Sequence, residues 1–444
     1  MKGEIPMSAR FRLFVVVACL SLAPALVRAQ GHLLHGTGPI NSSMGGAGTA
    51  LLEDSVAALT FNPALIAGVK GNQLSFTTEF FKDSIQIDTT IALPWDPKGV
   101  AGTATGRATG TSEVVIYPAF GWMSRHPEKK LAIGFGLIGI GGFRTDYPQD
   151  NASILFAQPP AGFGRIFTDY RLTKIPVAMA YQVTPKLALG ASFNVYYAEF
   201  AVAPLPYEVY DQNAQGQRFY PGAGNMNGRF ALGGQFGFVY QLTSKATIGA
   251  SLTTAQDFST YEWNSTYADP ASPDFGKTRT LSYSLGGPMI ISFGTGMKLG
   301  SKTDIAVDGM FTKFTGVDGL GSSGGIVNGV VQPFGWRDVW TFKAGVQHRA
   351  TEKLTVRVGY NYSQTPLRSE VILTGTGAPV TYQNHFCGGL GLKMFPFLTA
   401  EASFYYVPRE HVTGPFPVAQ GVNIGTLDTS NQVSSALIGL NFTF

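Results

Sequence analysis

VWTFKAGVQHRATEKLTVRVGYNYSQ (339–364) holds two runs of alternating apolar and polar residues on either side of a short polar turn, TEK (351–353). Alternation with a period of two is typical of a β-strand with one apolar and one polar face. The segment therefore predicts two antiparallel strands joined by a tight turn. In the second run, the apolar face consists of Leu354, Val356, Val358, Tyr360 and Tyr362.

The same arrangement recurs along the chain. Between these turns lie long connections, so tight turns would stand at one end of the sheet and long loops at the other. This asymmetry is typical of an up-and-down β-barrel in a bacterial outer membrane, which is the localisation that the pattern predicts. The other short hinges are RHPEKK (125–130), TPK (184–186), TSK (243–245), GSK (300–302) and FPF (395–397).

The count of strands is even, as a single-chain barrel with both termini on the periplasmic side requires. The sequence therefore predicts an all-β protein, a 14-stranded antiparallel transmembrane β-barrel with a small N-terminal helical hatch in its lumen. The predicted strands are 73–81, 113–124, 131–142, 171–183, 187–199, 229–242, 245–256, 282–299, 303–313, 339–350, 353–364, 385–395, 397–408 and 433–444.

Charged residues within the predicted strands are expected to face the lumen. An Arg facing lipid at the midplane of the bilayer would cost about 2–4 kcal/mol, so Arg357 must point inward. The same reasoning places Lys343, Asp308 and Glu401 in the lumen. They form either a structural charge network that fills the barrel or a polar contact for the headgroup of a ligand.

The N-terminal 29 residues are expected to be a signal peptide. They combine a basic start, the apolar stretch LFVVVACLSLAPALV (13–27) and the small residue Ala29, so the mature chain would begin near Gln30. A lipoprotein signal that presents Cys19 for lipidation is the alternative. The predicted organisation is a signal peptide (1–29), a hatch (30–72) and a barrel (73–444).

The hatch segment is rich in Gly, Ala and other small residues, and it is too short to fold alone. Helical spacing of apolar residues predicts a helix near 49–60, ended by Pro63 and followed by a second short helical turn. Small side chains suit packing inside a barrel. A disordered leader is the alternative.

Composition argues against several functional classes. The net charge of +4 is spread without a basic run, so no nucleic-acid partner is expected. The six His residues show no metal-ligand spacing, and no motif indicates a cofactor or an activated nucleophile. We expect neither a metal site nor enzymatic activity.

Two long connections are unusually apolar: ILFAQPPAGFGRIF (154–167) and FAVAPLPYEVY (200–210). Exposed apolar patches usually mark a binding surface. These segments therefore predict a site for a hydrophobic ligand, an apolar lid that folds inward, or both. The candidate ligand-binding residues are Ile154, Leu155, Phe156, Phe163, Ile166, Phe167, Phe200, Val202 and Leu205, with Lys343 and Arg357 as candidate polar contacts.

Four segments in order resemble the outer-membrane long-chain fatty-acid transporter family (FadL-type), which includes importers of aromatic hydrocarbons. In the hatch, SSMGGAGTALLEDSVAALTFNPA (42–64) carries the triplet Asn62, Pro63 and Ala64. The other three segments are GWRDVWTFKAGVQHRATEKLTVRVGYNYSQTPL (335–367), NHFCGGLGLKMF (384–395) and GLNFTF (439–444).

The resemblance implies a route for the ligand. In the family, loops capture a hydrophobic compound, an inner pocket receives it, and it leaves sideways through a gap made by a kink in the third strand. Here Gly139, Gly141 and Gly142 occupy the place of that kink, and Gly within a strand permits a bulge or bend. Alternatively, these small residues only make room for the hatch.

The ligand itself is left open. Fatty-acid members hold the carboxylate with basic residues, but YYAEFAVAPLPYEV (196–209) contains no Lys or Arg. The ligand could be a fatty acid, an alkane or an aromatic compound. The alternatives are a general diffusion porin for polar solutes and an adhesin or receptor that works through its loops. The expected partners are a hydrophobic ligand, outer-membrane lipid and lipopolysaccharide, and the barrel-assembly machinery through Phe444; the protein is expected to be a monomer.

Overall fold

The computed structural model describes residues 31–444 except 94–101, 112, 158, 160–161, 207, 209, 217, 328–329 and 420. The predicted signal peptide, Cys19 and the expected mature start at Gln30 lie outside the described residues.

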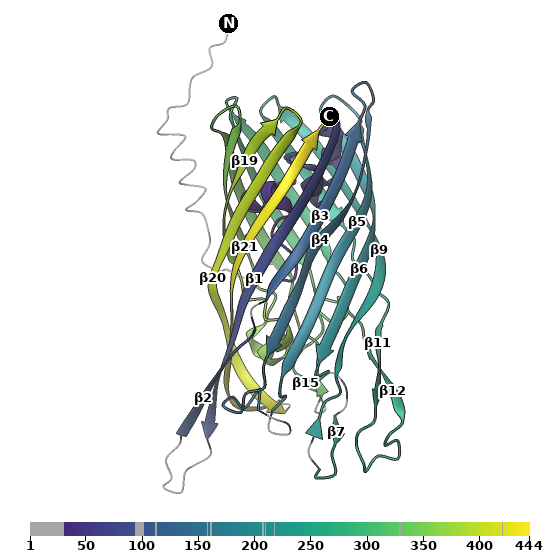
Figure 1. The fold of residues 1–444 in the computed structure, drawn as a ribbon, viewed down its shortest axis with the longest axis vertical. Helices are drawn as coiled ribbons and strands as arrows, with labels where there is room; N and C mark the ends of the chain where they lie inside the picture. The colour runs from purple at the N-terminus through teal and green to yellow at the C-terminus, as the bar shows by residue number, and fades with distance from the viewer. Residues whose placement is uncertain are drawn as a thin grey trace.

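Fourteen antiparallel strands close into a barrel, as the sequence predicted (Figure 1). The sheet closes where β1 pairs with both β3 and β21. At this seam, Asn72 and Phe444 exchange backbone hydrogen bonds of 2.7 and 3.1 Å. The barrel strands are β1 (Gly71–Leu93), β3 (Val114–Arg125), β4 (Leu131–Tyr147), β5 (Ile166–Gln182), β6 (Leu187–Ala203), β9 (Ala223–Thr243), β10 (Ala246–Thr253), β13 (Met289–Leu299), β14 (Thr303–Lys313), β17 (Val339–Arg349), β18 (Leu354–Ser363), β19 (Asn384–Phe395), β20 (Leu398–Ala419) and β21 (Val422–Thr443).

The six predicted hinges each join two neighbouring strands of this barrel, at the end where the connections are short. In outer-membrane barrels short turns face the periplasm and long loops face the exterior, so we call the two ends periplasmic and extracellular. One strand was predicted too long: 282–299 begins only at Met289. Gly286, Gly287 and Pro288 precede it, and neither Gly nor Pro favours a regular strand.

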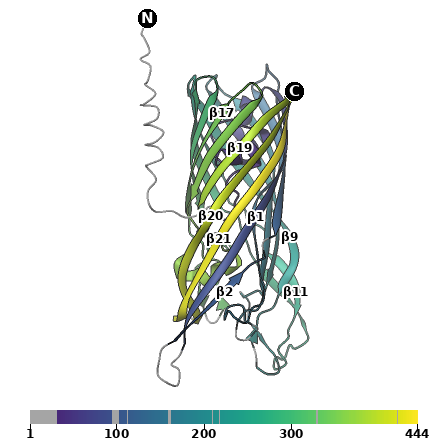
Figure 2. The same cartoon turned by 60° about the vertical axis from the view of Figure 1, so that its left-hand side comes forward.

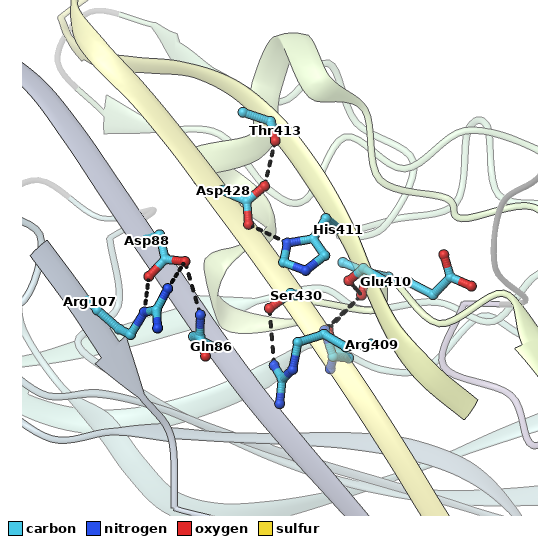
Figure 3. Close-up of polar contacts among 11 residues, drawn as sticks. Gln86, Asp88, Arg107, Arg409, Glu410, His411, Thr413, Asp428 and Ser430 are labelled. Carbon is cyan, nitrogen blue, oxygen red and sulfur yellow. Dashed lines mark hydrogen bonds and ion pairs between the residues drawn. The ribbon is translucent and has the colours of Figure 1, made fainter. Parts of the chain in front are cut away.

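Four strands continue beyond the barrel wall at the extracellular end (Figure 2). β1, β20 and β21 are 22 or 23 residues long, and β2 (Gly102–Thr109) pairs only with β1. Polar side chains on this extension contact one another (Figure 3). There Asp88 accepts two hydrogen bonds from Arg107, and the Oδ1 atom of Asp428 lies 2.7 Å from the Nδ1 atom of His411.

The extracellular loops contain short elements of their own. Among the described residues, no helix is both long and apolar enough to cross a membrane. The loop elements are β7 (Asp211–Gln212), β8 (Arg218–Phe219), β11 (Tyr261–Thr266), β12 (Thr278–Tyr283), β15 (Ile326–Val327), β16 (Val330–Val331) and the 3₁₀ segment η2 (Ser369–Gly377).

Strand alternation sorts side chains between lipid and lumen. On β21, Ile438 and Leu440 are exposed on the outside while Ser435 and Asn441 are buried inside. Arg357 is likewise buried within the barrel. The outward side of the wall is therefore the apolar one, as a lipid environment requires.

Residues 31–70 lie inside the periplasmic half of the barrel and form the hatch (purple in Figure 1). They contain α2 (Gly38–Ser43), α3 (Ser55–Phe61) and the 3₁₀ segment η1 (Pro63–Gly68). The predicted helix near 49–60 begins later because the Asp54 carboxylate accepts the Ala57 N–H and caps α3. The predicted second turn after Pro63 is η1.

Candidate functional site

An apolar pocket lies among the extracellular loops. It is lined by residues from six segments: the loop before β5, β5, β6, the loop after β6, the loop before β17, and η2. The pocket therefore exists only because distant parts of the chain meet. Its apolar lining includes Leu155, Phe163, Ile166, Val202, Pro204, Pro206, Val331 and Leu373, and the polar groups come from Thr168, Thr374 and Thr376. We call this the outer pocket.

Four of the predicted ligand-binding residues line the outer pocket: Leu155, Phe163, Ile166 and Val202. The structure places the other apolar ones elsewhere. Phe156 packs against Tyr147, Leu205 is fully buried in the core, and Ile154 packs at its edge. Phe167 lies beneath the guanidinium groups of Arg144 and Arg165. Ile166, Phe167, Phe200 and Val202 belong to strands, not to loops as the sequence suggested.

Below the outer pocket lies a layer of aromatic rings. Phe200 packs at 6.2 Å from Tyr170 and 5.6 Å from Tyr261, measured between ring centroids. The hatch contributes His32, whose ring stacks on Trp336 at 5.8 Å and meets Tyr170 edge-on at 5.7 Å. We call His32, Phe143, Tyr170, Phe200, Tyr261 and Trp336 the aromatic layer; Phe143 joins it through Tyr170 at 5.2 Å.

A second cavity, the inner pocket, lies between the aromatic layer and the hatch. Leu33, Leu34 and Phe61 line it from the hatch, and Ile140 and Met310 line it from the barrel wall. Polar groups are more frequent here than in the outer pocket. They come from Thr37, Thr60, Lys174, Tyr196, Gln235, Ser251, Thr253, Gln256 and Ser292.

The order of these three sites follows directly from the pairing of β5 with β6. Thr168 lies opposite Val202 in the outer pocket, Tyr170 opposite Phe200 in the aromatic layer, and Lys174 opposite Tyr196 in the inner pocket. Because a strand rises about 3.3 Å per residue, Thr168 and Lys174 are about 20 Å apart along β5. The two pockets are thus stacked, with the aromatic layer between them.

Polar side chains of the barrel hold the main chain of the hatch. Lys343 donates to the His35 carbonyl at 3.0 Å, and Asp308 accepts the Gly48 and Thr49 N–H groups at 2.8 Å each. Lys174 donates to the Leu59 carbonyl at 3.0 Å. These contacts fix a segment that has little regular structure of its own.

The candidate polar contacts Lys343 and Arg357 thus lie apart from the apolar residues. Arg357 donates to Glu401 at 2.7 Å and to Gln347 at 3.0 Å, within the barrel. Their contacts are those of a structural charge network, one of the two interpretations that the sequence left open. Lys174, which was not among the predicted contacts, is instead the Lys that lines the inner pocket.

The predicted triplet Asn62, Pro63 and Ala64 joins the hatch to the barrel wall. Asn62 donates from its side-chain amide to the Thr49 and Phe238 carbonyls, at 2.8 and 3.0 Å, and its side-chain oxygen accepts the Ala64 N–H at 3.0 Å. Pro63 begins η1, where its missing N–H is no loss. Ala64 packs against the wall at Gly190, where an added Cβ would stand 2.3 Å from the Ala64 nitrogen.

Backbone pairing between β3 and β4 stops partway along the barrel wall, and we call the unpaired stretch the gap. Among the described residues, these strands pair only from Ser124 and Ile133 to Ala119 and Ile138, although both continue beyond Ala119 and Ile138. The residue of β3 next to the last paired residue, Ala119, is Pro118, which has no N–H to donate. A cavity lies beside this gap, lined in part by Val115, Tyr117, Gly142, Phe143 and Arg144.

The predicted kink residues lie along this gap. The register of β4 against β5 shifts between Gly139 and Gly141, which marks a bulge. Gly142 has φ +153°, and an added Cβ there would stand 2.2 Å from the Tyr170 carbonyl oxygen. Gly141 makes room for the hatch, because its added Cβ would stand 2.3 Å from the His32 oxygen.

The hatch covers the edge of β4 that β3 leaves free. The Leu34 N–H donates to the Ile140 carbonyl at 3.0 Å, and the Gly142 N–H donates to the His32 carbonyl at 2.8 Å. An unpaired strand edge is costly at membrane depth, so this short strand-like contact satisfies groups that would otherwise lack partners. Gly141 thus makes room for the hatch beside the bulge, and a lateral opening at these Gly residues stays a prediction.

Sequence reasoning missed η2, whose Leu373, Thr374, Thr376 and Gly377 line the outer pocket. The available signal was the apolar run Val371, Ile372 and Leu373 inside a connection between strands. Within the described part of the chain, no three His, Cys, Asp or Glu side chains are grouped so that they could hold a metal ion.

Comparison with known proteins gives a family match over nearly the whole chain. Residues 20–444 match the model of the outer membrane protein transport protein family (OMPP1/FadL/TodX). No curated protein sequence matches this chain.

Solved structures share the fold at low identity. The *P. putida* toluene transporter TodX superimposes with a TM-score of 0.66 at 17% identity, covering 93% of this chain and 99% of that one. A *Pseudomonas aeruginosa* FadL homologue gives 0.66 at 14% identity, and the *Ralstonia pickettii* toluene transporter TbuX gives 0.64 at 17%, both with the same coverage.

Proposed function

The chain belongs to the OMPP1/FadL/TodX family of outer-membrane transport proteins, and from this premise we propose a route for hydrophobic small molecules through it. The protein lies in the bacterial outer membrane, and the family is one of transporters. The ligand is captured in the outer pocket, passes the aromatic layer into the inner pocket, and leaves sideways between β3 and β4. No energy source is needed, because the ligand moves down its own gradient.

The observation that carries this proposal is the end of β3–β4 pairing at Ala119 and Ile138 beside a cavity. A hydrophobic ligand gains about 0.8 kcal/mol for each CH₂ that leaves water for an apolar site. A side exit into lipid preserves that gain, whereas a water-filled channel into the periplasm would lose it. The hatch also occupies the periplasmic half of the lumen, which disfavours a general diffusion porin.

The ligand class remains that of hydrophobic compounds: fatty acids, alkanes or aromatic hydrocarbons. Lys174 is the cation that lines the inner pocket, where it also donates to Gln235 at 2.7 Å. A ligand with an acidic headgroup would find its counter-charge there. Lys343 and Arg357 serve the hatch and the wall instead.

Filling the side exit tests the route. Val115 faces the cavity beside the gap, whereas its neighbour Val114 is exposed on the outer face. We expect Val115→Trp to reduce uptake of radiolabelled toluene and oleate by cells at least about tenfold, because a Trp blocks the exit. Val114→Trp should leave uptake unchanged.

Equilibrium binding separates the exit from the capture site. Detergent-purified Val115→Trp should bind the same ligands as the unaltered protein, since the outer pocket is untouched. Normal uptake by Val115→Trp cells would exclude exit at this gap. Absence of binding to the unaltered protein by any apolar compound would exclude the function as a whole.

We also propose partners that follow from the barrel. Phe444 is the exposed C-terminal residue of the closing strand and would be read by the barrel-assembly machinery. The apolar wall contacts lipid, and the polar extension of Figure 3 stands where lipopolysaccharide headgroups lie. We propose a monomer, because the fourteen barrel strands of a single chain close the wall without a second copy.

A further inference from the structure

The aromatic layer contains buried polar atoms that lack hydrogen-bond partners. These are both ring nitrogens of His32, the hydroxyls of Tyr170 and Tyr261, and the indole nitrogen of Trp336; none finds a partner among the described residues. All four side chains are at most 2% exposed. A buried polar group without a partner carries its full desolvation cost, so four together require an explanation.

Several neighbouring aromatic residues do not share this feature. Tyr283 donates to the Gly319 carbonyl at 3.2 Å, Trp263 to the Asn225 carbonyl at 2.7 Å, and Tyr382 to the Gly31 carbonyl at 3.1 Å. The fold thus supplies acceptors for the polar ends of these aromatic side chains. The hydroxyls of Tyr147 and Tyr196 also lack partners, but in this layer four such side chains lie together, between the outer and inner pockets.

The position of the layer makes it a point of passage. Tyr170 and Phe200 lie opposite each other on β5 and β6. On one side of them is the pair Thr168 and Val202, which lines the outer pocket, and on the other side is the pair Lys174 and Tyr196, which lines the inner pocket. A ligand that moves from one pocket to the other must part these rings. While it does so, it contacts both their faces and their unpartnered polar atoms.

We propose that the aromatic layer selects aromatic ligands that carry a neutral hydroxyl group, such as alkylphenols; this inference rests on the proposed function. A hydroxyl both donates and accepts, which suits Tyr hydroxyls, the indole N–H and a His nitrogen. The ligand's ring packs against the rings of the layer in edge-on or offset geometry. A saturated chain can make neither set of contacts.

The layer favours a hydroxyl over a carboxylate. Its unpartnered atoms belong to Tyr, Trp and His, with no Lys or Arg among them. Arg229 lies 5.9 Å from the Tyr261 ring, but it already donates to the Thr260 carbonyl at 2.7 Å. A carboxylate would therefore lose its hydration here without gaining a free counter-charge.

Three probes of similar size test the proposal on the detergent-purified full chain. *p*-Cresol has a ring and a hydroxyl, *p*-xylene has a ring and a methyl in its place, and 4-methylcyclohexanol has a hydroxyl but no aromatic ring. Dissociation constants are measured by equilibrium binding of the radiolabelled compounds. In the comparison of variants, each compound is compared with itself, so differences in water solubility cancel there.

The variant Tyr170→Phe/Tyr261→Phe removes two unpartnered hydroxyls and keeps both rings. We expect it to weaken *p*-cresol binding about tenfold, from the loss of hydrogen bonds worth a factor of a few each, and to change *p*-xylene binding less than about twofold. The control Tyr283→Phe removes a hydroxyl that is already satisfied and should change neither constant. Unaltered protein should bind 4-methylcyclohexanol about tenfold more weakly than *p*-cresol.

Each possible result supports or overturns a stated part of the proposal. Equal loss for *p*-cresol and *p*-xylene, or no loss for either, overturns the selectivity while leaving the transport proposal intact. Equal affinity for *p*-cresol and 4-methylcyclohexanol removes the role of the rings. Retained *p*-xylene binding in the same preparation shows that the double variant is folded. If the unaltered protein binds none of the three and no other apolar compound, the proposed function itself fails.

Discussion

The two halves of the lumen are closed in different ways. In the periplasmic half, charged and amide side chains of the wall bind main-chain groups of the hatch, as Lys343 binds the His35 carbonyl and Asp308 the N–H groups of Gly48 and Thr49. In the extracellular half, aromatic and aliphatic side chains fill the space.

This difference suits the periplasmic half to closing the lumen and the extracellular half to binding a ligand. Directional hydrogen bonds to main chain specify one position of the hatch, and breaking them leaves buried groups unpaired. Apolar contacts are non-directional, so a hydrophobic ligand can replace them with contacts of equal quality. In the extracellular half, a ligand can therefore replace contacts between side chains, whereas in the periplasmic half it cannot.

Removal of the hatch should have the largest effect. Without residues 31–70, the charged and amide groups of the wall would face water in an open lumen. We expect the conductance of single barrels in planar bilayers to rise at least about tenfold, since a barrel of this size then holds an aqueous channel. The unaltered protein, with its hatch, is the control. Unchanged conductance would mean that the extracellular half alone closes the barrel.

Substitutions in the Arg357–Glu401 pair test how much the buried charges of the barrel wall contribute to stability. Its side chains are 5% and 3% exposed and lie 2.7 Å apart. Arg357→Met leaves a buried carboxylate without its partner and should lower the free energy of unfolding by about 3–5 kcal/mol. Arg357→Met/Glu401→Leu removes both charges and should recover much of that loss. Urea unfolding in detergent measures both; equal stability of the single and double variants would contradict the prediction.

Asp308 tests the seal between wall and hatch. Asp308→Ala deprives the Gly48 and Thr49 N–H groups of their acceptor and should cost about 1–3 kcal/mol for each group left unpaired. The matched control is Asp274→Ala, which breaks an exposed pair with Lys277 and should change stability by less than about 1 kcal/mol. The same unfolding assay applies. Equal effects at the two sites would show that the hatch is not held as described.

Two Tyr residues give the smallest effect and sharpen the contrast within the extracellular half. Tyr283→Phe loses a hydrogen bond to Gly319 and should destabilise the protein by about 0.5–1.5 kcal/mol. Tyr170→Phe removes an unpartnered hydroxyl and should leave stability unchanged or slightly raised. Thermal unfolding of both variants without ligand measures the difference. A larger loss at Tyr170 would show that its hydroxyl is satisfied in the unliganded protein.

Local pattern was enough to predict the barrel. Period-two alternation and short hinges report directly on a strand with lipid on one side, so strands such as 303–313 match β14 from end to end. The extension of β1, β20 and β21 was missed because it carries polar side chains, such as Asp88 and His411, and so gives no lipid-facing signal.

The site was less predictable because it depends on contacts between distant segments. Leu155 and Val202 could be recognised as apolar residues in connections, but η2 joins them only through the fold. Thr49 could have continued a helix by local spacing, yet its N–H and carbonyl are bound by Asp308 and Asn62. Likewise, nothing local distinguishes Tyr170 from Tyr283, since a missing partner is a property of the surroundings.

The exchange of hydrogen bonds between Asn72 and Phe444 joins the first strand to the end of the last. The wall is therefore closed by the pairing of β1 with β21, the first and last barrel strands along the chain. The hatch directly precedes β1, so it is joined covalently to the strand at this seam. Substitutions that weaken the pairing of β1 with β21 would therefore affect both the closure of the wall and the anchoring of the hatch.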